Sequence, residues 1–331
     1  MSPVRPGPAP IPPFRTEPFY QLLPWGGRAM ETALGKKIPP GAVAEAWEVS
    51  AHPKGVCTVA SGPRAGTGLD RLVQEEGPAL LGAAVYEKYR GEFPVLIKLI
   101  DVNELASVQV HPDDAWAMRL EGWPRGKTEA WYILSRAPEA RFSLGLVPGV
   151  SPQAFREALD AGRAQDLLAS PEVRPGDCLF VPPGTVHAAG NGVLLLEVQQ
   201  SSDITYRVYD WDRVDRDGKR RELHVEKALQ VIDFSAKPRI FHAEARGDAL
   251  NPVLSCPHFE IAEARVVSRL TLPAAAACAT GTVASGSSAV GGGGESFTVR
   301  AGESFVVPPG QEIQLVKSGG SPAVIVMTFF V

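Results

Sequence analysis

The chain has 331 residues, of which 44% are hydrophobic and 21% are charged, so it is long enough and apolar enough to form a sizeable globular core. Its formal net charge of −4 argues against a nucleic acid or an anionic membrane as the main partner. The sequence holds no apolar run of about eighteen residues, so we expect no membrane span. Four cysteines that lie far apart and an N-terminus without an apolar signal segment favour a cytoplasmic protein with free thiols.

The first predicted elements follow a Pro-rich N-terminus, residues 1–15, which we expect to be extended over the surface. Leucines and a valine at helical spacing predict a helix over 68–89. Residues 94–111 hold two β-rich runs around a polar turn. A serine followed by proline at the first helical position predicts a helix over 151–169.

Short strands and tight turns are predicted over 173–209, followed by a charged loop over 213–221 and a helix over 223–232. Towards the C-terminus helical spacing disappears, and short apolar runs alternate with loops. We therefore predict two domains, a catalytic domain over 1–235 and a β-domain over 236–331.

The sequence contains an internal repeat. Residues 173–187 align without gaps on residues 299–313, with seven of fifteen positions identical. Such self-similarity indicates one strand–turn–strand unit used twice. His187 of the first copy corresponds to Ile313 of the second, so a metal bound through this histidine could not be bound in the same way by the second copy.

Two predicted strands carry polar residues on one face, because alternate residues of a strand share a face. One strand places Ser107, Gln109 and His111 together, and the other places Lys127 with Glu129. A polar strand face meets either solvent or the interior of a small barrel, where it forms a binding site.

The candidate ligands are Gln109, His111, Glu129 and His187. Two imidazoles, a carboxylate and a carboxamide oxygen suit Zn²⁺, with Fe²⁺, Co²⁺ and Mn²⁺ as alternatives. Such a set leaves coordination positions open for water or substrate oxygens, as in a catalytic site.

Four runs of sequence carry a family resemblance. They are LASVQVHPDD (105–114), GKTEAWYIL (126–134), FVPPGTVHA (180–188) and LLEVQQSSDITYRVYDWDR (195–213). In this order they resemble the type I mannose-6-phosphate isomerases, most closely the short form of Bacillus-like bacteria. The resemblance covers about residues 20–235.

This resemblance implies a mainly β fold, a cupin-type β-barrel (jelly roll) with a helical insertion, followed by a second, cupin-like β-domain without metal. It implies one Zn²⁺ per chain, bound by Gln109, His111, Glu129 and His187. The implied reaction interconverts mannose 6-phosphate and fructose 6-phosphate through a cis-enediol, so the expected partner is a small phosphorylated sugar. The chain is expected to be a monomer or a homodimer.

The resemblance also implies roles for residues around the metal. Arg207 matches an arginine that assists catalysis, and Glu197 and Lys127 are the two candidates for the proton-transferring base. We favour Glu197, because a carboxylate needs little pKa tuning to act as a base at neutral pH. Lys98 and Lys127 match lysines that line the pocket, and Ser107 matches a serine at the phosphate end. We expect these three residues to hold the dianionic phosphate of the substrate through charge and hydrogen bonds.

One position departs from the family pattern. Longer members carry a histidine where this chain has Gly126, so the proton-transferring residue remains open between alternatives. Two other functions fit the ligand pattern alone. They are an Fe²⁺-dependent cupin oxygenase and a non-catalytic sugar- or metal-binding module.

Overall fold

The computed structural model describes residues 11–211, 213–214, 218–244 and 246–331. The first ten residues of the Pro-rich stretch and part of the predicted charged loop therefore lie outside the described residues. Where the Pro-rich stretch is described, it is not on the surface: Ile11 and Phe14 are buried, and β1 (Phe14–Glu17) begins there.

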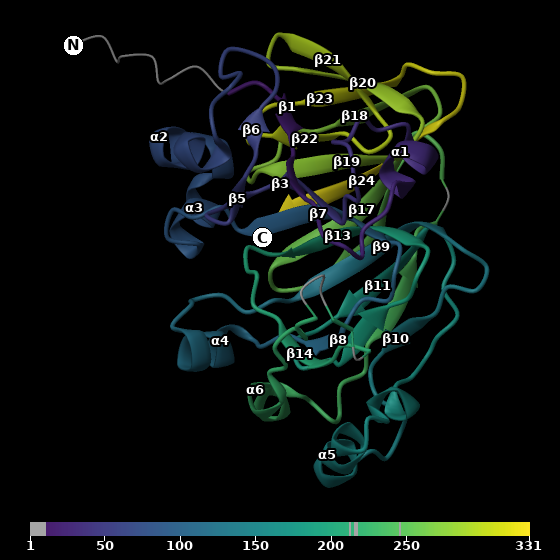
Figure 1. Ribbon diagram of the computed structural model, residues 1–331. Coiled ribbons are helices and arrows are strands. Elements are labelled where there is room, and N and C mark those ends of the chain that lie inside the picture. The colour runs from purple at the N-terminus through teal and green to yellow at the C-terminus, as the bar shows by residue number, and fades with distance from the viewer. Residues whose placement is uncertain (1–10, 212, 215–217, 245) are drawn as a thin grey trace. The chain divides into compact units, whose positions relative to one another are not determined.

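The chain divides into two compact units (Figure 1). The central unit consists of Tyr20–Trp47 and Val95–Ala243, and the terminal unit consists of Met1–Phe19, Glu48–Pro94 and Glu244–Val331. The terminal unit thus joins segments from both ends of the chain, and the domain boundary at 235/236 stays a prediction.

The central unit is built on two sheets. The larger has the strand order β15-β11-β9-β13-β7-β3-β2 and the smaller the order β10-β12-β8-β14. The larger sheet contains β2 (Phe19–Gln21), β3 (Glu45–Val49), β7 (Val95–Val102), β9 (Glu129–Arg136), β11 (Asp177–Val181), β13 (Val193–Gln200) and β15 (Arg239–His242). The smaller sheet contains β8 (Val108–Val110), β10 (Phe142–Leu144), β12 (His187–Ala189) and β14 (Tyr206–Tyr209).

The terminal unit repeats this pattern with the orders β16-β17-β24-β19-β22-β1-β6 and β18-β23-β20-β21. Its larger sheet adds β6 (Thr58–Val59), β16 (Ala249–Ser255), β17 (Phe259–Val266), β19 (Ala279–Ser285), β22 (Ser304–Val307) and β24 (Ala323–Phe330) to β1. Its smaller sheet contains β18 (Arg269–Leu272), β20 (Ser287–Gly292), β21 (Glu295–Arg300) and β23 (Ile313–Lys317). A two-stranded ribbon joins β4 (Ala51–His52) to β5 (Gly55–Val56).

The mainly β prediction is confirmed, and hydrogen bonds among the described strands leave separate sheets of seven and four strands rather than one closed barrel. The predicted repeat is also confirmed. Its two copies form β11 and β12 in the central unit and β22 and β23 in the terminal unit, each with a Pro-Pro-Gly turn between the strands.

The predicted helices are present with different ends. The helix expected over 68–89 forms α2 (Leu69–Leu81) and α3 (Ala83–Lys88), which Gly82 separates with a φ of +87°. The helix expected over 151–169 is α5 (Pro152–Asp160), whose Ser151 cap accepts a hydrogen bond from the backbone N–H of Ala154.

A 3₁₀ turn, η1 (Ala164–Leu167), follows α5. The third predicted helix is α6 (Val225–Val231). Two helices were not predicted: α1 (Ala29–Leu34) and α4 (Asp114–Glu121), the latter capped by Asp113.

None of the described helices is long and apolar enough to cross a membrane. All four cysteines are free, as expected.

The interior face of the central unit changes from apolar to polar along β13 and β9 of its larger sheet. On β13, Val193 and Leu195 belong to a buried hydrophobic cluster, whereas the next residue on that face is Glu197. On β9, Ile133 belongs to this cluster and Glu129 lies four residues earlier on the same face. Full burial of such aliphatic side chains contributes about 1.5–3 kcal/mol each. The apolar end thus anchors the strands, and the polar end forms the site.

Candidate metal centre and adjoining cavity

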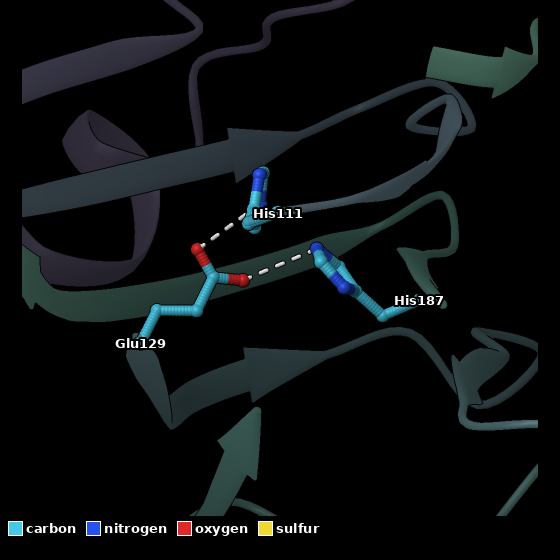
Figure 2. Close-up of side chains that lie close together, drawn as sticks. All are labelled: His111, Glu129 and His187. Carbon is cyan, nitrogen blue, oxygen red and sulfur yellow. Dashed lines mark ion pairs between the residues drawn. The ribbon is translucent and has the colours of Figure 1, made fainter. Parts of the chain in front are cut away.

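Three potential metal ligands come together from three strands (Figure 2). His111 follows β8 directly, Glu129 is the first residue of β9 and His187 is the first residue of β12. Their ligand atoms all lie within 4.8 Å of one another, and all three side chains are at most 1% exposed. The structure therefore brings three of the four predicted ligands into one group that could hold a metal ion, and Gln109 is the fourth.

Both imidazoles are oriented by backbone carbonyls. Nδ1 of His111 lies 2.8 Å from the carbonyl oxygen of Ile204, and Nδ1 of His187 lies 2.8 Å from that of Thr185. A carbonyl only accepts, so Nδ1 carries the proton and Nε2 keeps its lone pair. Burial lowers the pKa of His187 to about 4, and burial followed by the charge of Lys127 lowers that of His111. Both rings are therefore neutral at pH 7, as metal ligation requires.

The two Nε2 atoms converge on one carboxylate, as the dashed lines in Figure 2 show. Nε2 of His187 lies 3.2 Å from Oε1 of Glu129, and Nε2 of His111 lies 3.4 Å from Oε2. Lone pairs on nitrogen and oxygen that face each other in a buried site repel unless a cation lies among them. Oε2 of Glu129 also lies 2.7 Å from the ammonium of Lys127, whereas Oε1 has no hydrogen-bond partner among the described residues, so the position between Oε1 and Nε2 of His187 fits a cation.

Gln109 adjoins this group. It pairs with His187 across β8 and β12, and its amide nitrogen lies 3.2 Å from Nε2 of His187. The nitrogen and oxygen of an amide exchange positions by rotation, so the same side chain can present its carbonyl oxygen to a cation. The residues present therefore fit a divalent metal ion.

A cavity of about 110 Å³ adjoins the metal-binding group. Five of the residues that the sequence predicted for the site line it: Lys98, Ser107, Gln109, Lys127 and Glu197. Arg207 lies beside it, since its Nε donates to Oγ of Ser107 at 3.2 Å and it pairs with Gln109 across β14 and β8.

Lys98 is paired with carboxylates inside the cavity. Its Nζ lies 3.2 Å from Glu45 and 3.6 Å from Glu197, and it also lies over the ring of Trp47. Burial alone would lower the pKa of Lys98, but the two carboxylates outweigh it and raise the pKa. Lys98 thus remains charged, and its predicted contact with phosphate stays a prediction.

Lys127 connects the metal-binding group with the cavity. Its Nζ lies 2.7 Å from Glu129, 3.2 Å from Nε2 of His111 and 3.7 Å from Glu197. Burial lowers its pKa, yet Glu129 and Glu197 more than compensate, so the pKa is raised and the ammonium persists. For Glu197 the order is reversed, because burial raises its pKa more than Lys127 lowers it.

Gly126 leaves no room for a side chain. A Cβ at this position would overlap the carbonyl oxygen of Pro112 and the carbonyl carbon of Asp113. Its backbone N–H donates to Oδ1 of Asp114 at 2.7 Å, which fixes the loop that carries Lys127. The position where longer family members have a histidine is therefore filled here by the backbone of another segment.

Several lining residues were not singled out from the sequence. They include Trp25, Glu45, Asp203, Thr205 and Arg221. Of these, only Glu45 could have been found from the sequence, because it alternates with Trp47 on β3 and therefore shares a face with it. In the structure its carboxylate accepts a hydrogen bond from the indole of Trp47 at 2.7 Å. The remainder reach the cavity through the tertiary fold.

The terminal unit has apolar or small residues at the matching positions. The cross-strand pairings of the two units show which positions correspond. Leu272 corresponds to Gln109, Ala279 to Glu129, Met327 to Glu197 and Ala262 to Lys98. With Ile313 in place of His187, none of these positions offers the imidazole, carboxylate or amide ligands of the central unit.

Comparison with known proteins gives consistent results. Residues 14–134 match the family model of the catalytic domain of type I phosphomannose isomerase. A relative named "Probable mannose-6-phosphate isomerase" from Bacillus subtilis is 36% identical, over 89% of this chain and 93% of its own length. The mannose-6-phosphate isomerase of Streptococcus mutans is 35% identical over 86% and 88% of the two chains. The crystal structure of a Bacillus subtilis mannose 6-phosphate isomerase is similar with a TM-score of 0.84 and 31% identity, over 96% of this chain and 99% of that one.

Proposed function

The chain belongs to the type I mannose-6-phosphate isomerase family, and we propose that it interconverts mannose 6-phosphate and fructose 6-phosphate in the cavity beside His111, Glu129 and His187. The convergence of these three buried side chains next to a cavity lined by Lys127 and Glu197 carries the proposal. An isomerase of this kind needs a base and a concentration of positive charge at one place, and both kinds of group meet here.

We propose that the metal is one Zn²⁺ per chain, held by His111, Glu129, His187 and the amide oxygen of Gln109. Two neutral imidazoles and a carboxylate are the nitrogen and oxygen ligands that zinc accepts in catalytic sites. When bound, a divalent ion supplies Lewis-acid stabilisation of the negative charge that develops on the substrate oxygens.

We propose Glu197 as the base that moves the proton between C1 and C2 through the cis-enediol. Its carboxylate lines the cavity, and burial raises its pKa towards the range in which a base is most effective. Lys127 is the weaker candidate, because the carboxylates of Glu129 and Glu197 keep its ammonium protonated.

Positive charge supports this step from two sides. Lys127 places its ammonium between the metal-binding group and Glu197, where it can stabilise negative charge on the substrate. Arg207 adds a guanidinium that does not deprotonate at working pH and that donates to Ser107 on the cavity wall. We propose both as catalytic residues.

A coupled assay for fructose 6-phosphate tests this function. Purified chain supplied with Zn²⁺ should convert mannose 6-phosphate under anaerobic conditions, because the reaction consumes no oxygen. Absence of turnover with metal bound would instead favour a non-catalytic sugar-binding module, and a requirement for oxygen would favour an oxygenase. The comparisons favour neither alternative.

The cytoplasmic location and the monomeric or dimeric state stay predictions.

A further inference from the structure

Two hollows in the central unit have a common wall. The cavity of about 110 Å³ and a neighbouring hollow of about 280 Å³ are both lined by Trp25 and Arg221. The second hollow is also lined by Asp210 and Arg213. Arg221 therefore stands where the cavity of the proposed chemistry meets the wider hollow, a position at which one end of a substrate could be held.

A buried carboxylate fixes the orientation of Arg221. Its Nε donates to Oδ2 of Asp210 at 2.7 Å, and its Nη2 donates to Oδ1 of the same carboxylate. Arg213 also donates to this carboxylate, and the Asp210 side chain is only 7% exposed. Burial raises the pKa of Asp210, but the hydrogen bonds from Arg221 and Arg213 outweigh it and leave the pKa below its usual value. The carboxylate is thus a permanent anchor for both guanidinium groups.

Arg221 keeps donors for a ligand. Nη1 donates to none of the residues that the structure describes, and the side chain is 37% exposed. A guanidinium that is held on one edge presents a planar pair of N–H groups on the other, which matches two oxygens of a phosphate.

The carboxylate partners of the basic residues also favour Arg221 as the phosphate-binding group. Inside the cavity each lysine has two carboxylate neighbours, Glu45 and Glu197 for Lys98 and Glu129 and Glu197 for Lys127. Arg213 and Arg221 share the carboxylate of Asp210, while Glu104 lines the wider hollow and Asp203 lines the cavity. Arg207 is close enough that Arg221 contributes, after burial, to lowering its pKa. Among the described residues Arg221 therefore has fewer carboxylate partners within ion-pair distance than either lysine, so a phosphate meets less competition at Arg221.

We propose that Arg221 binds the phosphate group of the substrate and that Asp210 is the positioning residue that holds its guanidinium. This inference rests on the proposed function and adds the direction of the substrate. The sugar carbons that react lie towards Gln109 and Lys127, and the phosphate lies towards Trp25 and Arg221.

The test compares Arg221→Ala with Arg220→Ala, a neighbouring arginine that lines neither hollow. Hydrogen bonds to charged groups contribute about 1.5–3 kcal/mol, and every 1.4 kcal/mol is tenfold. We expect Arg221→Ala to raise the KM for mannose 6-phosphate about 10- to 100-fold with kcat nearly unchanged, and to weaken competitive inhibition by inorganic phosphate to a similar extent. Arg221→Lys should lie between Arg221→Ala and the wild type, and Arg220→Ala should match the wild type.

Asp210→Asn tests the positioning role. It should raise KM and leave kcat nearly unchanged, with a melting temperature that shows whether the variant is folded. If Arg221→Ala kept the wild-type KM and the wild-type inhibition by inorganic phosphate, the proposal would be overturned. A loss confined to kcat would overturn it as well.

Calorimetric titration of mannose 6-phosphate separates this inference from the proposed function, because it needs no turnover. A wild-type chain that bound the sugar phosphate without isomerising it would contradict only the proposed function. Weaker binding by Arg221→Ala in that titration supports the phosphate site, and equal affinity of the two proteins rejects it.

Discussion

His187 and Ile313 are the first residues of β12 and β23, the same position in two copies of one strand–turn–strand unit. Both side chains are at most 1% exposed, so each fills the interior of its own unit. The imidazole meets Glu129, whereas Ile313 belongs to a cluster of aliphatic and aromatic side chains. The same position thus contributes to core packing in the terminal unit and to a group that could hold a metal ion in the central unit.

This relationship predicts opposite effects for two matched variants. His187→Ala should lose most of the bound zinc, because one of the ligands is removed and Glu129 faces an empty space. Ile313→Ala should keep one zinc per chain and lose about 2–5 kcal/mol of unfolding free energy through the cavity it creates. Elemental analysis and chemical denaturation measure the two outcomes. Undiminished zinc in His187→Ala would contradict the ligand set.

Arg207→Ala should retain its metal and lose turnover. The guanidinium contacts Ser107 and a backbone carbonyl rather than the metal-binding group, so ligation is expected to be unaffected. Loss of one positive group that stabilises developing oxyanion charge typically reduces kcat about 10²- to 10³-fold. Arg156→Ala, on the exposed face of α5, is the control for a lost arginine. A wild-type rate in Arg207→Ala would remove it from the catalytic residues.

Glu197→Gln should abolish the proposed base while conserving shape. General-base catalysis contributes about 10²- to 10⁴-fold, so kcat should fall by a factor in that range. The amide can still accept the hydrogen bond of 3.1 Å from Trp131, but it cannot balance the charges of Lys98 and Lys127, so the melting temperature should be measured beside the rate. A folded Glu197→Gln variant with a normal rate would show that another group moves the proton.

Local signals sufficed for much of the fold. The Ser151 cap marked the start of α5, and the alternation of residues over 107–111 and along β9 predicted that Gln109, His111 and Glu129 face one interior. Helix ends were less predictable, because Gly82 divides one expected helix into two. Within the described residues the strands also form separate sheets, a property that local alternation does not determine.

The partners of charged residues were the least predictable part of the site. A buried lysine in an apolar run needs a partner, and Lys98 was expected to find it in the cavity as a phosphate. The structure supplies Glu45 and Glu197, which are 53 and 99 residues away along the chain. Arg221 likewise reaches the cavity from a charged run that looks like an ordinary loop. Such pairings depend on tertiary contacts, which the sequence pattern does not contain.

Gly126→Ala provides a test of the loop that carries Lys127 and Glu129. A methyl group at this position overlaps the backbone at Pro112 and Asp113, and backbone cannot rotate aside as a side chain can. Overpacking of this kind costs about 1–3 kcal/mol, so the variant should be less stable by that amount. Because the displaced loop holds a proposed ligand, zinc content and turnover should fall together with stability. Gly320→Ala is the matched control, since its Cβ meets no atom within 4 Å. Equal denaturation midpoints for the two variants would show that the loop yields easily, and a histidine at position 126 would then be sterically possible in this chain.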